Sequence, residues 1–125
     1  MMFKPLFTFV GLFTLVLGVI LIVAPRAYLS LYVPDFQVSM VFAAQRLAPA
    51  IIGLGALLLL ARDLARGVFA ARFAALMSLV WFGVAATGVF HYATGVAAAG
   101  ILIAGVTEVI LGTLFVIAAR QMRPA

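Results

Sequence analysis

The chain has 125 residues, of which 68% are hydrophobic and only 9% are charged. A soluble domain is about half apolar and about a quarter charged, and one of this length could not enclose so much apolar surface in a single core. The composition therefore excludes an ordinary soluble protein and predicts an integral membrane protein whose solvent is lipid. The length predicts one domain, residues 1–125, and leaves no room for a second.

The residue content excludes several chemistries. The chain has no cysteine and a single histidine, His91, so disulfides, thiolate catalysis and multi-histidine metal sites are ruled out. It contains no phosphate-binding glycine loop, no HExxH and no nucleophile elbow, so neither a cofactor nor a metal is predicted. The net charge of +5 comes from basic residues at the ends of apolar runs, which indicates lipid head groups as the partner and not nucleic acid.

Four apolar runs are long enough to cross a bilayer, which takes about 20 residues in a helix. We therefore predict an all-α fold, an integral membrane four-helix transmembrane bundle. The first run is longer than a signal-peptide core of about 7–15 residues, and Pro25 stands where cleavage would be expected, so we expect a retained helix. In chain order the predicted spans are residues 6–24, 38–61, 68–90 and 96–119.

The basic residues between the spans predict the orientation. Six lie on one side of the predicted bundle and Arg26 alone lies on the other, which is a strong positive-inside bias. We therefore expect both termini to be cytoplasmic. The six are Lys4, Arg62, Arg66, Arg72, Arg120 and Arg123.

The loops predict how the spans are connected. Residues 62–67 and 91–95 are so short that each should form an antiparallel hairpin, the first between spans two and three and the second between spans three and four. The first loop is longer, and its residues 26–33 have the pattern of a short amphipathic helix lying in the interface. Asp35 is placed to cap the start of the second span.

Two charged residues, Arg46 and Glu108, lie inside predicted spans. A charge at the centre of a span costs about 2.5–3.5 kcal/mol on insertion scales and is not left facing lipid. Small residues share a helix face with each charge, which favours close contact with another helix, so we expect both charges to point inward. These residues are Ala43, Ala50 and Gly53 beside Arg46, and Ala104, Gly105 and Gly112 beside Glu108.

Arg46 and Glu108 are matched in depth. Counted from the cytoplasmic ends of their spans, their heights differ by roughly 6 Å, which an arginine side chain can cover. We expect a buried ion pair, with Gln45 or Thr107 assisting. One interpretation is a proton-coupled or anion-binding centre, or an acid–base pair, and the other is a structural bridge that locks helix register. The sequence leaves both open.

Two further residues of the spans have a functional and a structural interpretation. Pro49 removes a backbone hydrogen bond one helical turn from Arg46, which predicts either a hinge or close packing. Trp81 lies well inside the third span and either walls a lipophilic pocket or fills the bundle core.

The layout as a whole carries a resemblance. An apolar first span ends in Pro25, Arg46 precedes Gly53-Leu54-Gly55 in the second span, and Glu108 lies in the fourth. This resembles small bacterial four-helix inner-membrane proteins of unknown function, and it is loosely similar in layout to DoxX-type proteins without sharing their signature residues. The resemblance implies a bacterial inner (plasma) membrane location and implies no activity and no catalytic residues.

These observations lead to three hypotheses of function. The first is a non-enzymatic accessory or scaffold subunit that packs with another membrane protein or with itself. It is suggested by helix faces that carry small residues, by short loops and by the lack of a catalytic motif. The alternative is a homo-oligomeric carrier or binder of a small lipophilic or anionic molecule that uses Arg46, Glu108 and Trp81. An enzyme acting on a lipid-soluble substrate, with Glu108 as acid or base, ranks third.

Overall fold

The computed structural model describes residues 3–124, and within that range the protein is helical and has no strand. Four of its helices are long and apolar enough to cross a membrane, which confirms the four predicted spans as helices with shifts of a few residues at their ends. A short fifth helix falls in the first loop, where the amphipathic pattern predicted one. The helices are α1 (Phe3–Val23), α2 (Pro25–Ser30), α3 (Ser39–Ala61), α4 (Val68–Ala93) and α5 (Gly100–Met122).

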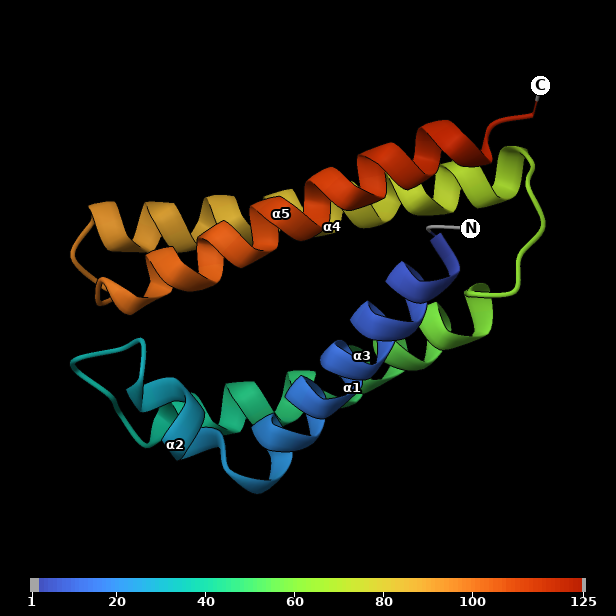
Figure 1. The fold of residues 1–125 in the computed structure, drawn as a ribbon. Helices are drawn as coiled ribbons and strands as arrows, with labels where there is room; N and C mark the ends of the chain where they lie inside the picture. Colours follow the sequence, from blue (N-terminus) through green and yellow to red (C-terminus); the bar gives the residue numbers. More distant parts are fainter. Residues whose placement is uncertain (1–2, 125) are drawn as a thin grey trace.

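The long helices form two antiparallel pairs, α1 with α3 and α4 with α5. The pairs lie together at the end of the molecule that carries both termini and diverge toward the other end (Figure 1). The predicted hairpin between spans three and four is confirmed, because these spans are α4 and α5, which pack on each other. The predicted hairpin between α3 and α4 is wrong, because the short turn joins these helices while each packs laterally on a different neighbour.

Glycines explain why α3 packs on α1. A Cβ atom placed on Gly55 would lie 2.7 Å from the carbonyl oxygen of Gly11, and one on Gly18 would lie 3.2 Å from the carbonyl oxygen of Ala48. Backbones approach this closely only where side chains are absent or very small, which is the common basis of helix association in membranes. The pair α1–α3 is therefore selected by small residues on both partners.

The pair α4–α5 uses glycines differently. A Cβ atom on Gly112 would lie 2.7 Å from the ring of Phe82, and one on Gly88 would lie 3.2 Å from the side chain of Ile101. In this pair a large side chain of one helix fills the space over a glycine of the other. Close packing at glycines is thus common to both pairs.

The core lies where the two pairs meet. Phe7 of α1 is fully buried, with its ring centroid 5.5 Å from that of Phe115 on α5 and 5.7 Å from that of Phe73 on α4. Leu58 of α3 and Met122 of α5 are also fully buried and belong to the same cluster. All four long helices therefore contribute to one core at the end that carries the termini.

One backbone hydrogen bond links the pairs at the opposite end. The N–H of Ala98, before α5, donates to the carbonyl oxygen of Tyr32, after α2, over 2.8 Å.

The expected cap at the start of the second span is wrong: α3 begins at Ser39, next to Val38, and receives no side-chain cap from Asp35. The chain between α2 and α3 instead contacts the α4–α5 pair, through the hydrogen bond from Ala98 to Tyr32.

Candidate functional site

Arg46 lies on the exposed face of α3. Gly55, which packs on α1, is nine residues further along and so points about 180° away from Arg46. The small residues beside Arg46 are exposed too, and a Cβ atom on Gly53 would meet nothing within 4 Å. The structure therefore corrects the expectation that Arg46 points inward. Small residues occur on two faces of α3, and the glycines of α1 pack against the face that carries Gly55 and not against the face that carries Arg46.

Glu108 lies on the inward side of α5. It is half-buried and shares its face with buried residues, including Phe115 two turns away. Burial, then Tyr32 and then the charge of Glu108 raise the pKa of Tyr28 to about 12. Glu108 is therefore within electrostatic reach of Tyr28 in α2.

The predicted ion pair between Arg46 and Glu108 does not form. Both ion pairs among residues 3–124 are made by Asp63. Arg46 and Glu108 were predicted to lie at similar heights, but α3 packs on α1 and α5 packs on α4, so the two residues belong to different helix pairs. Height along a helix follows from residue number, whereas lateral distance depends on which helices pack together.

The two residues expected to assist this pair have other partners. The amide of Gln45 donates to the carbonyl oxygen of Ile22 over 3.1 Å, which ties α3 to the end of α1. The hydroxyl of Thr107 donates to the carbonyl oxygen of Ile103 over 3.3 Å, within its own helix. Gln45 is thus a structural contact between paired helices.

Trp81 is part of the core, which agrees with the structural interpretation of this residue. Its side chain is 6% exposed, and its ring centroid lies 6.4 Å from that of Phe13 on α1. Its Nε1–H has no hydrogen-bond partner among the described residues, and neither has the buried hydroxyl of Thr14. Thr14 was not predicted from the sequence, although its position on the glycine-bearing face of α1 was a signal that its hydroxyl would be buried.

Pro49 lies within α3, which continues without interruption from Ser39 to Ala61. Its side chain is on the exposed part of the helix surface, as Arg46 is. The hinge interpretation of Pro49 remains a prediction.

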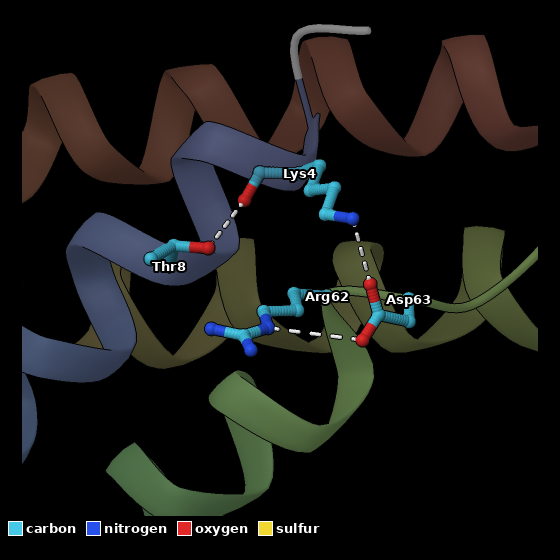
Figure 2. A network of polar contacts seen from close by, with 4 residues as sticks. All are labelled: Lys4, Thr8, Arg62 and Asp63. Carbon is cyan, nitrogen blue, oxygen red and sulfur yellow. Dashed lines mark hydrogen bonds and ion pairs between the residues drawn. The ribbon is translucent and has the colours of Figure 1, made fainter.

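A polar cluster joins the start of α1 to the turn after α3 (Figure 2). Lys4 Nζ lies 3.0 Å from one carboxylate oxygen of Asp63, and Arg62 Nε lies 3.7 Å from the other. The hydrogen bond and charge of Lys4, followed by Arg62, lower the pKa of Asp63 from its ordinary value of 3.8. The hydroxyl of Thr8 donates to the carbonyl oxygen of Lys4 over 2.9 Å.

From the sequence, Lys4 and Arg62 were expected only to mark the orientation, and no site was predicted at them. The predicted topology contained the missing signal, since it put the start of the first span and the turn after the second on the same side. Asp63, in that turn, is the acidic residue that brings the two cations together.

No family model, curated protein or solved structure matches the chain in comparisons with each. The resemblance to small four-helix membrane proteins therefore stays a prediction.

Proposed function

We propose that the protein is a non-enzymatic accessory or scaffold subunit that lies in a membrane. It packs through the exposed face of α3 against another membrane protein or another copy of itself. The observation that carries this proposal is the position of Arg46, which is exposed on a helix long and apolar enough to span a membrane. Small residues surround it, at Ala43, Ala50 and Gly53.

The energetics favour a covered face. Arg46 lies seven residues after the first residue of α3, which is about 10 Å along the helix axis. A cation facing hydrocarbon is costly, whereas an acceptor on a neighbouring helix offsets that cost. The competing explanation is that the arginine side chain extends to the nearer membrane surface, so that no partner is needed.

Site-specific cross-linking separates these explanations. The natural chain has no cysteine, so a single introduced cysteine is the only thiol in the protein. We expect Ala50→Cys, carrying a photoactivatable thiol label in native membranes, to give one discrete cross-linked product. The control is Val106→Cys, on the exposed side of α5. If Ala50→Cys gives only the diffuse lipid adducts expected of the control, the face is not an interface and the proposal fails.

The mass of that product identifies the partner. A product of twice the mass of the chain indicates self-association, and any other discrete mass indicates a different subunit. Adding Arg46→Leu to Ala50→Cys should reduce the yield, because the partner loses the cation it contacts.

The same proposal places the protein in a bacterial inner membrane with both termini cytoplasmic. The orientation is supported by the excess of basic residues at the end of the molecule that carries the termini, where Arg62 and Arg66 follow α3. Single cysteines in the 62–67 turn and in the 94–99 turn test this with a membrane-impermeant thiol reagent. Only the second should be labelled in intact cells.

A second candidate function is a carrier or binder of a small lipophilic molecule. The observation that favours it is Glu108, which is half-buried on the inward side of α5 and has no ion-pair partner in residues 3–124. Because Arg46 lies elsewhere, the geometry favours a neutral or cationic molecule over an anion. Native mass spectrometry of the gently extracted protein should then show a retained small molecule that Glu108→Gln loses.

A further inference from the structure

An apolar groove runs between α1 and α5 at the end of the molecule that carries the termini. It has a volume of about 460 Å³ and is lined by Pro5, Leu6 and Phe9 from α1 and by Thr107, Ile110 and Leu114 from α5. The one polar lining group among these, the Thr107 hydroxyl, already donates to a backbone carbonyl of its own helix. Because the groove lies between two membrane-spanning helices, hydrocarbon chains are what surround it.

A second, polar pocket adjoins this groove. It has a volume of about 550 Å³, and Pro5 lines both cavities, so the two lie next to each other at this residue. Its charged lining residues are Lys4, Arg62 and Asp63, the cluster drawn in Figure 2. These residues lie at the ends of α1 and α3, where a spanning helix leaves the hydrocarbon and enters the head-group region.

The charges of the polar pocket suit an anion. Two cations face one carboxylate, so the three groups together carry a net charge of +1. Asp63 engages Arg62 at Nε, and the two terminal nitrogens of the guanidinium lie outside that contact. The Lys4 ammonium group contacts one oxygen of Asp63 and has three N–H donors, so further donors are left for another ligand. A phosphate placed between these cations would receive charge-assisted hydrogen bonds from both.

We propose that the groove and the pocket form one binding site for an anionic phospholipid. An acyl chain lies along α1 and α5 in the groove, and the phosphate is held by Lys4 and Arg62. The apolar groove selects a lipid over a free phosphate. The net positive charge selects an anionic lipid over a zwitterionic one, whose ammonium group would be repelled by the same two cations. Asp63 competes with the phosphate for both cations and so weakens binding.

Lipid titration of the delipidated, full-length protein in neutral detergent, read by native mass spectrometry, tests the proposal. The probes are phosphatidylglycerol and phosphatidylcholine with identical acyl chains. We expect the protein to bind phosphatidylglycerol more tightly. The double variant Lys4→Gln/Arg62→Gln should weaken that binding by roughly fivefold for each cation removed, with little effect on phosphatidylcholine.

Matched variants make the result specific. Arg72→Gln/Arg120→Gln removes the same net charge from exposed residues that line neither cavity and should leave the preference unchanged. Asp63→Asn should tighten phosphatidylglycerol binding, which misfolding would not produce. Ile110→Trp should weaken binding of both lipids by filling the groove, while Ile103→Trp, on the exposed surface of the same helix, should not.

Three results would overturn the assignment. Equal binding of the two lipids by the natural protein would remove the head-group site. An equal loss of binding in the two double variants would show a general effect of charge. Full competition by glycerol phosphate, which has no acyl chain, would show that the groove takes no part. None of these results depends on whether α3 has a partner, so the accessory role and the lipid site succeed or fail separately.

Discussion

Gly11 and Gly55 bring the backbones of α1 and α3 into direct contact, since a Cβ atom on Gly55 would lie 2.7 Å from the carbonyl oxygen of Gly11 and from the backbone nitrogen of Leu15. Both neighbours are backbone atoms, which cannot move aside as a flexible side chain can. Gly55→Ala should therefore destabilise the folded protein by about 1–3 kcal/mol, the usual cost of overpacking. Reversible unfolding in mixed detergent micelles measures the difference.

Gly53→Ala is the matched control for this prediction. It lies two residues away on the same helix, and its Cβ atom would meet nothing within 4 Å. Alanine is the better helix former, so this change should be neutral or slightly stabilising. Equal effects of the two substitutions would contradict the close approach of α1 and α3.

Phe7 holds the two helix pairs together. Its ring is fully buried between Phe73 of α4 and Phe115 of α5. Phe7→Ala should cost about 3–5 kcal/mol of stability, as loss of a buried aromatic side chain usually does, and should let the pairs separate further. Distances between spin labels on α3 and α4 measure the separation. Phe9→Ala, at a residue 62% exposed, is the control and should change neither quantity.

Asp63 makes stability depend on pH in the acid range. Because Lys4 and Arg62 lower its pKa below 3.8, the folded protein holds this carboxylate ionised more strongly than the unfolded chain does. The resulting stabilisation is present above pH 3.8 and is lost as the pH falls through the lowered value. Thermal denaturation between pH 7 and pH 2.5 should show a loss that is smaller in Asp63→Asn. The same loss in both proteins would show that the cluster contributes nothing.

Thr14 carries a buried hydroxyl that finds no partner among residues 3–124. Thr14→Val keeps the shape and removes the unsatisfied group, so it should be neutral or should stabilise the protein by about 1 kcal/mol. Thr113→Val, whose hydroxyl donates to the carbonyl oxygen of Val109 over 2.8 Å on an exposed face, should have no such benefit. A clear destabilisation by Thr14→Val would mean that the hydroxyl is bonded, to a bound molecule or to water.

The candidate residues show where prediction from sequence succeeded and where it failed. The depths of Arg46 and Glu108 could be worked out from residue numbers, because a helix rises by a constant amount per residue. Their lateral separation could not, because α3 was assigned its inward face from small residues that occur on two sides of the helix. The inward orientation of Glu108 was predicted correctly, since the small residues of α5 are concentrated on its buried side.

The sequence by itself determined the number, order and approximate ends of the membrane helices, because a long apolar run is a local property and lipid demands that its backbone be helical. Only the tertiary structure decided which helices pair, that the pairs meet at one end, and that Lys4, Arg62 and Asp63 converge there. The physical reason is that these helices are apolar around their whole circumference. Hydrophobicity then cannot distinguish the face that meets another helix from the face that meets lipid, and close packing at Gly11, Gly55 and Gly112 makes that choice.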